Sequence, residues 1–219
     1  VETVNLPLTE AAIITFTAGP SGYPLGIVRT HAQILEQHAA MSAVLAPLAT
    51  SVTATNIPTV ALSNLALGVP TVLLSQADKR SVNRLLNAEI LLTEGEQPAM
   101  VSRLVISPAM AAKLVDSLGN DSLPMDDVIV TGPIYPDIAQ KLDKALEHGS
   151  LRIVYGHPEV DPIAEQSFAD MISADRLATS VGRGVLVGKP VPEVELAILP
   201  DDYGMPIGPF TRSEFKQYC

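Results

Sequence analysis

The sequence has 219 residues, 47% of them apolar, and its 14 basic against 24 acidic side chains give a net charge of −10. This much apolar material suffices for one large domain or two small ones. The acidic balance argues against nucleic-acid or anionic-membrane partners, because both are polyanions. Apolar runs are short and broken by Pro, Gly or Ser, so membrane insertion is not expected. With no leader-like N-terminus and a single cysteine, Cys219, we expect a cytoplasmic protein without an intrachain disulfide.

Strand-like and helix-like segments alternate along most of the chain. Apolar, β-branched runs predict strands at 12–17, 70–74, 127–131 and 151–155, with short apolar runs at 90–93 and 104–107. Helical spacing or capping predicts helices at about 30–45, 78–88, after Pro108, and around 138–146. Apolar strands separated by helices are typical of a three-layer α/β fold, a mostly parallel sheet with helices on both faces.

The texture of the sequence changes after about residue 175. Gly and Pro are frequent between 182 and 209, and residues 193–199 (EVELAIL) alternate as a strand does. We therefore expect a short β-rich C-terminal extension. The predicted division is an α/β nucleotide-binding-like domain over 1–175 and the start of a β-rich subdomain over 176–219.

A glycine-rich turn, residues 17–26 (TAGPSGYPLG), follows the first predicted strand. Between a strand and a helix, such a turn lets backbone N–H groups converge on an anion. The turn lacks the Gly-Lys-Ser/Thr ending of a phosphate loop and the glycine spacing of a dinucleotide fingerprint. Leu25 stands where a phosphate loop would supply a lysine. By itself, a turn of this kind is more often a tight connection.

A second candidate segment, residues 155–162 (YGHPEVDP), ends a predicted parallel strand, at the edge where open α/β sheets bind ligands. Tyr155 could stack on a flat ring, Gly156 permits close approach, and the Glu159 carboxylate could hold Mg²⁺ on phosphate oxygens. A solvated acidic turn is the alternative. His157 has no evident catalytic partner and is interpreted as a loop histidine, while His38 and His148 are expected at the surface.

Together the two segments resemble motifs of the adenylate-forming (AMP-binding, acyl-CoA-ligase-like) superfamily. The family's pyrophosphate loop, T-S-G-[ST]-T-G-x-P-K-G, is matched at Thr17, Gly19, Gly22, Pro24 and Gly26. Its Y-G-x-T-E motif is matched at Tyr155, Gly156 and Glu159, and residues 131–136 (TGPIYP) take the place of a segment beside the adenine. The resemblance runs from about residue 11 to about 215 and covers part of the family's large N-terminal domain.

The resemblance implies an ATP-dependent ligase that activates a fatty or other carboxylic acid as an acyl-adenylate and passes the acyl group to a thiol. It implies ATP/AMP and Mg²⁺ as ligands, with Glu159 as the metal-binding residue. The nucleotide-binding residues that it implies are Thr17, Gly19, Ser21, Gly22, Gly26, Gly132, Tyr155, Gly156 and Glu159.

Departures from the family pattern predict weakened binding. Leu25 replaces a lysine, and Ala18 and Pro158 replace hydroxyl residues. Charge-assisted hydrogen bonds contribute about 1.5–3 kcal/mol each, so two or three losses would weaken Mg-ATP binding about a hundredfold or more. The family's ribose-binding Asp segment, hinge and lysine-bearing C-terminal domain are also not found in these residues. We therefore expect impaired or no activity from this chain alone.

Two alternatives stay open. One is a non-catalytic relative or fragment that acts as a binding or interaction module. The other is an unrelated doubly wound protein that binds a small anion, which requires the family match to be chance. In either adenylate-forming interpretation, exposed apolar surface predicts self-association as a homodimer.

Overall fold

The computed structural model describes residues 4–18, 22–46, 51–74, 89–90, 99–157, 159–198, 211 and 213–214. Its first half contains β1 (Ala11–Ala18), β2 (Pro24–Thr30), α1 (His31–Leu45), β3 (Val52–Thr55), α2 (Pro58–Ala66), β4 (Thr71–Leu73), β5 (Glu89–Ile90) and β6 (Ala99–Ile106). Its second half contains α4 (Pro108–Leu118), β7 (Asp127–Thr131), α5 (Pro136–Ala145), β8 (Ser150–His157), β9 (Val160–Ser167), a 3₁₀ turn (Phe168–Asp170), α6 (Ser173–Ser180) and β10 (Lys189–Pro190). No helix in these ranges is long and apolar enough to cross a membrane.

The main sheet has the strand order β10-β9-β8-β7-β6-β3-β4, and β5 pairs with β6 beside this path. The pairings from β8 through β7, β6 and β3 to β4 are all parallel. The two strands at the other edge, β9 and β10, are antiparallel to their neighbours. The prediction of a mostly parallel α/β sheet is therefore confirmed.

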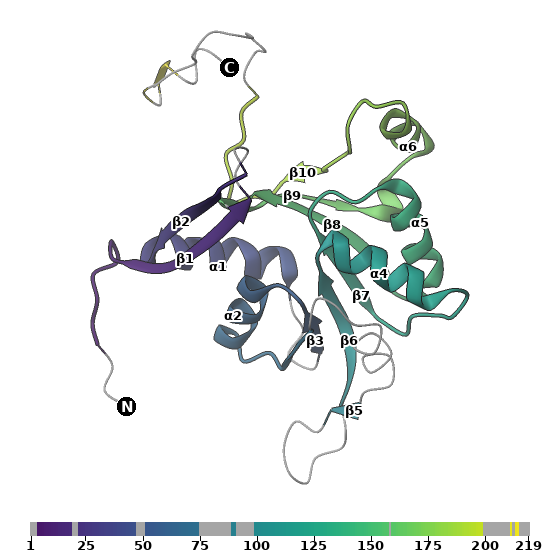
Figure 1. Cartoon of the computed structure of the whole chain (residues 1–219), viewed down its shortest axis with the longest axis horizontal. Helices are drawn as coiled ribbons and strands as arrows, with labels where there is room; N and C mark the ends of the chain where they lie inside the picture. Colours follow the sequence, from purple (N-terminus) through teal and green to yellow (C-terminus); the bar gives the residue numbers. More distant parts are fainter. Residues whose placement is uncertain are drawn as a thin grey trace.

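Helices cover both faces of this sheet, as Figure 1 shows. On β7, Val128 and Val130 point into the core cluster shared with α4 and α5, whereas Ile129 points into the cluster shared with α1 and α2. All three side chains are fully buried. Strands buried on both faces need mostly apolar residues, which is why the apolar run at 127–131 correctly predicted β7. The predicted three-layer arrangement is confirmed.

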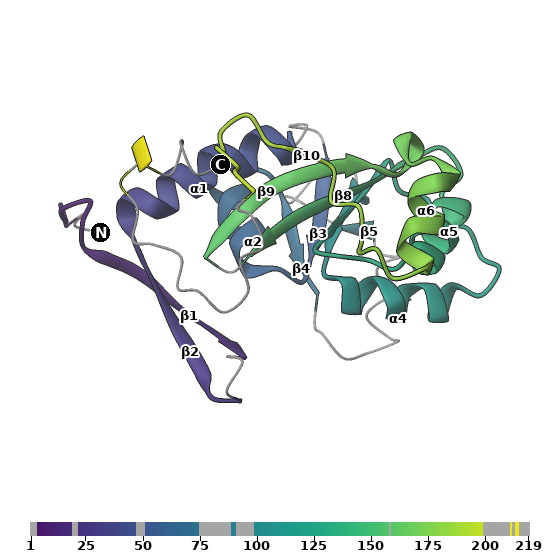
Figure 2. The same cartoon turned by 90° about the horizontal axis from the view of Figure 1, so that it is seen from above.

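The glycine-rich turn does not lead into a helix. It joins β1 to β2, which pair as an antiparallel hairpin outside the main sheet, and Figure 2 shows this hairpin extending outward from the body of the molecule. The predicted strand–turn–helix arrangement was therefore wrong. A seven-residue strand separates the turn from α1, which begins only where the Thr30 hydroxyl accepts a hydrogen bond from the Gln33 N–H at 3.3 Å.

The C-terminal extension contributes little to the sheet in the part that the structure describes. β10 is the one strand there, and residues 193–198 form none, so the strand predicted over 193–199 was wrong for these six residues. The chain turns away from β9 after Val191, because the Val194 N–H donates to the Val191 carbonyl at 3.0 Å. Leu199 and the helix predicted over 78–88 lie outside the described residues.

An ionic cluster ties α1 to the amino-terminal end of β7. The Asp127 carboxylate accepts hydrogen bonds from Arg103 Nε at 2.9 Å and Arg152 Nη2 at 2.8 Å. Arg103 also donates to the Leu45 carbonyl, and Arg152 to the Val44 carbonyl at 2.7 Å. Both arginines therefore connect the sheet to the last turn of α1.

Candidate functional site

Two adjoining cavities lie between the hairpin, α1 and the carboxyl end of the parallel strands. The first, which we call the glycine cavity, has a volume of about 300 Å³ and is lined by Gly132 and Gly156 among others. The second, the acidic cavity, has a volume of about 440 Å³ and includes Glu159 in its wall. Arg29 and Asp161 line both. Ligands of open α/β sheets bind at this edge, as the sequence predicted.

Gly132 and Gly156 are at positions where the backbone conformation or close packing requires glycine. Gly132 follows β7 with a φ of +126°, and a Cβ there would lie 3.1 Å from Pro108 Cγ. A Cβ on Gly156 would lie 2.1 Å from Asp161 Oδ1 and 2.8 Å from its Cγ. Gly156 thus lets the Asp161 carboxyl pack directly against β8. Both glycines also line the glycine cavity. Because they have no side chains, the cavity is bounded by their backbone atoms at these two positions.

Tyr155 does not line either of these two cavities. It is half-buried on β8, opposite Ala164 of β9. Strand alternation puts it on the same face as Ile153, whereas the glycine cavity lies on the other face. The structure therefore brings Gly132 and Gly156 together in the wall of one cavity. Tyr155 lies on the opposite face of the sheet from that cavity.

Glu159 is exposed in the turn between β8 and β9, where its carboxylate lies 2.6 Å from His157 Nδ1. His157 therefore has an acidic partner, although no third group among the described residues completes a catalytic arrangement with them. Among the described residues, no group of three His, Cys, Asp or Glu side chains could hold a metal ion. One carboxylate still fits Mg²⁺, because proteins commonly hold this ion by one or two carboxylates while nucleotide phosphates supply other oxygens.

The residues of the glycine-rich turn are only partly described. Gly19 and Ser21 lie outside the described residues, as does the side chain of Thr17. Gly22 has a φ of +78°, a left-handed conformation suited to glycine, with no atom within 4 Å of a Cβ placed there. Gly26 lies in β2, where a Cβ would contact the Phe16 ring at 3.4 Å. The structure does not bring these two glycines to the wall of either cavity.

Sequence reasoning missed Arg29, the one Lys or Arg among the described residues that line the two cavities. It lies on β2, only 7% of its surface is exposed, and its Nη1 donates to Thr15 Oγ1 at 3.1 Å. Its position could not be predicted, because the sequence did not reveal that β2 folds back on β1. Asp161 was missed as well. Burial raises the pKa of Asp161, and the positive charge of Arg29 opposes that shift.

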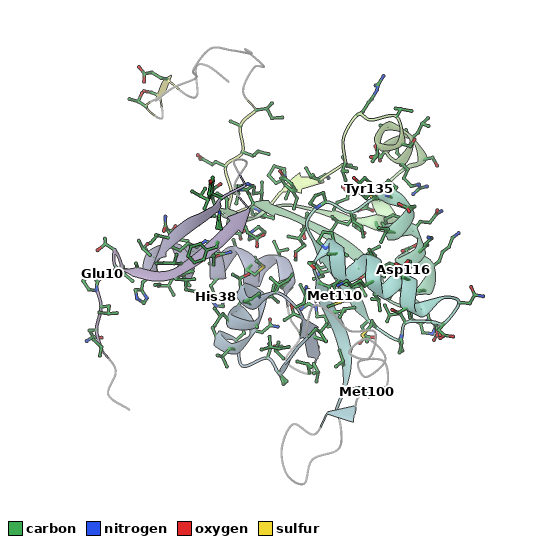
Figure 3. All side chains as sticks on the ribbon, viewed as in Figure 1. Glu10, His38, Met100, Met110, Asp116 and Tyr135 are labelled. Carbon is green, nitrogen blue, oxygen red and sulfur yellow. The ribbon has the colours of Figure 1, made fainter. Side chains whose placement is uncertain are left out.

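His38 was expected at the surface, and this was wrong. It is half-buried where α1 meets α2, and its Nδ1 lies 2.8 Å from Ser63 Oγ (Figure 3). These two residues line an apolar cavity of about 130 Å³ with Ile13, Leu35 and Leu62. This contact could not be predicted because α2 itself was not predicted. His148 is exposed, as expected.

The fold of the chain is shared with solved structures. Over most of its length, the chain shares the fold of the N-terminal domains of adenylate-forming enzymes. No protein-family model matches the sequence, and no curated protein matches it at the sequence level.

The solved structures that share this fold include VinN, with a TM-score of 0.65 and 18% identity over 95% of this chain and 50% of VinN. O-succinylbenzoate CoA synthetase (MenE) from Bacillus subtilis, bound to the acyl-adenylate OSB-AMP, has a TM-score of 0.65 and 16% identity over 89% of this chain and 38% of MenE. An ATP-bound RpMatB-BxBclM chimera has a TM-score of 0.60 and 16% identity over 87% of this chain and 36% of the chimera. The chain thus spans half or less of each.

Proposed function

We propose that this chain is the nucleotide-binding part of an adenylate-forming ligase, which activates a carboxylic acid with ATP. The observation that carries the proposal is the pair of cavities at the carboxyl end of the parallel strands, next to Gly132, Gly156 and Glu159. Structures with the same fold were solved with AMP, with ATP and with OSB-AMP bound. A fatty acid as the substrate, and residues 1–175 as the binding unit, are part of this proposal.

In this proposal each motif residue has a distinct task. The turn from Thr17 to Gly26 would surround phosphate oxygens with backbone N–H groups, with Gly19, Ser21 and Gly22 at its centre. Gly132 and Gly156 would allow the nucleotide to approach the backbone. Tyr155 lies outside both cavities, so it would stack on the adenine only if the base extends past the end of β8. Glu159 would hold Mg²⁺, which neutralises phosphate charge when it is bound. Only Oε2 of Glu159 contacts His157, so Oε1 is the oxygen that would hold the ion.

Calorimetric titration with AMP and with Mg-ATP tests the nucleotide site. We expect both to bind the wild-type chain at micromolar to millimolar concentration. Tyr155→Ala should weaken both about tenfold or more, because stacking on an aromatic side chain contributes about 1–3 kcal/mol per base. Glu159→Gln should weaken Mg-ATP and leave AMP unchanged, because only Mg-ATP brings the metal.

Glu147→Gln is the matched control, since it removes one exposed carboxylate beyond the end of α5 and outside both cavities. Absence of binding by both AMP and Mg-ATP at millimolar concentration would refute the nucleotide site. Equal loss of affinity in Glu147→Gln and Glu159→Gln would refute the metal-binding role of Glu159.

A second candidate function is a non-catalytic binding or interaction module with the same fold. Three observations favour it: Leu25 in the turn, the contact between His157 and Glu159, and the half or less of the related structures that the chain spans. In this case the chain alone would bind nucleotide without catalysing ATP–pyrophosphate exchange. Exchange stimulated by any carboxylic acid would exclude this candidate.

Self-association belongs to the same proposal. One face of the β1–β2 hairpin carries the large, exposed side chains Ile14, Phe16 and Val28. Burying apolar surface of this kind favours a second copy of the chain as the partner.

A further inference from the structure

Arg29 is a buried guanidinium at the boundary of the two cavities. It lies opposite Ile13 on the hairpin face that turns toward the body of the molecule, and it is 7% exposed. Its hydrogen bond to Thr15 Oγ1 uses one of the five N–H donors that a guanidinium carries. Arg29 lines both cavities, as do Gln37 and Asp161.

Arg29 has no ion-pair partner in the described part of the chain, where the ion pairs involve Arg103, Arg152 and His157. Taking a charge out of water is costly unless an opposite charge or several hydrogen bonds compensate it. Thr15 supplies a single neutral acceptor. Asp161 is near enough for the positive charge of Arg29 to act on its pKa, but it forms no direct ion pair with the guanidinium, which keeps N–H donors for an anion.

The two cavities differ in charge, and this difference decides where an anion fits. The acidic cavity is lined by four carboxylates, those of Glu36, Glu159, Asp161 and Glu193. Among the described residues that line the glycine cavity, Asp161 is the one carboxylate, and Thr15, Thr59 and Thr131 supply hydroxyls. An anion is repelled from the first cavity and finds donors in the second.

We propose that Arg29 anchors an oxyanion in the glycine cavity, as the cation that Leu25 does not supply to the neighbouring turn. The oxyanion is either a phosphate group of the nucleotide or the carboxylate of the acid substrate. This inference rests on the proposed function for the identity of the ligand, but not for the anion site itself. A bidentate guanidinium contact to phosphate or carboxylate is the strong form of such a hydrogen bond.

The state of Asp161 fits an anion beside Arg29. Burial raises the pKa of Asp161, so its surroundings favour the uncharged carboxyl more than water does. An oxyanion on Arg29 would screen the one positive charge that opposes this shift, and would favour the protonated form further. The other titratable groups in the two cavity walls are His157, Glu159, Glu36 and Glu193.

The test compares the wild-type chain with Arg29→Met, which removes the charge, and with Arg29→Lys, which keeps it. Lys141→Met is the matched control, because it removes one exposed cation from α5, on the opposite face of the sheet. The probes are adenosine, AMP, inorganic pyrophosphate and butyrate, titrated calorimetrically, and circular dichroism verifies that each variant is folded. Adenosine binding reports the nucleoside site without an anion.

We expect Arg29→Met to weaken the anionic probes about tenfold to a hundredfold, Arg29→Lys to retain part of their affinity, and Lys141→Met to leave it unchanged. Loss confined to AMP and pyrophosphate assigns the site to phosphate, and loss confined to butyrate assigns it to a carboxylate. Anion binding that depends on Arg29 without any adenosine or AMP binding supports the anion site and refutes the nucleotide function. Unchanged affinity for every anionic probe in Arg29→Met, or no anion binding by the wild type, overturns the inference.

Discussion

The Asp127 carboxylate compensates the positive charges of two arginines of the sheet, Arg103 and Arg152. Burial alone would raise the pKa of this carboxyl, but the hydrogen bond and charge of Arg152, together with those of Arg103, bring it below its ordinary value of 3.8. Arg103 is only 5% exposed. Without the Asp127 charge, it would remain buried and uncompensated. We therefore expect Asp127→Asn to reduce the free energy of unfolding by about 3 kcal/mol at neutral pH, measured by urea denaturation.

Asp126→Asn provides the control for this substitution. Asp126 is exposed, and its backbone N–H and carbonyl, rather than its side chain, make its hydrogen bonds to Ser102 and Ser150. Its replacement should shift the unfolding midpoint by a small fraction of the Asp127 effect. Equal midpoints for both variants would show that the arginine cluster contributes nothing specific.

Asp161 should affect stability with the opposite pH dependence. Because burial raises its pKa in the folded chain above 3.8, it contributes stability that is fully present below that value. The contribution is lost as the pH rises through the folded pKa. Asn cannot ionise, so the stability of the wild type relative to Asp161→Asn should fall as the pH rises from about 4 to 7.

Urea unfolding of the two proteins at several pH values in this window measures the effect. Asp127 contributes stability that is lost as the pH falls, but it is present in both proteins and therefore cancels. A constant difference between wild type and Asp161→Asn across the window would contradict the raised pKa of Asp161.

At the scale of elements, α1 depends on its first turn. The Thr30 hydroxyl accepts from the Gln33 N–H at 3.3 Å, and the Gln33 side chain accepts from the Thr30 N–H at 2.9 Å. Replacing a threonine N-cap by alanine typically costs about 1 kcal/mol. We expect Thr30→Ala to lower the unfolding free energy by that amount, and Thr30→Ser to restore most of it. No difference between the alanine and serine variants would show that this cap does not stabilise α1.

Elements buried on both faces were the most predictable. Residues 127–131 and 151–155 are apolar enough to identify β7 and most of β8, and the helix after Pro108 showed its apolar spacing. β3 was missed because Val52–Thr55 contains two threonines, although all four residues are buried. The hairpin was missed because pairing of β2 with β1 is a non-local event that periodicity does not record.

The candidate site was predictable only where it depends on chain order. The sequence placed Gly156 and Glu159 at the carboxyl end of a strand, and the structure confirms that position for β8. The sequence could not predict that Tyr155 lies on the sheet face opposite the glycine cavity. Nor could it predict that Arg29 lines this cavity. Both outcomes depend on strand register, which is set by tertiary packing rather than by local composition.

At the scale of the whole molecule, the β1–β2 hairpin presents an exposed apolar face that a partner could cover. Phe16 is 72% exposed and Ile14 57%, and strand alternation puts both on one face of β1, in the hairpin that projects from the body (Figure 2). We expect the wild-type chain to form dimers at micromolar concentration, measured by sedimentation velocity. Ile14→Ser should shift the chain to monomers, because it removes apolar area from the contact at a residue that lines neither the glycine cavity nor the acidic cavity. Leu177→Ser on α6 removes a side chain of 64% exposure far from the hairpin and should leave the dimer intact. A monomeric wild type at all concentrations up to about 100 µM, well above the micromolar Kd that an interface of ordinary size can give, would refute association through the hairpin.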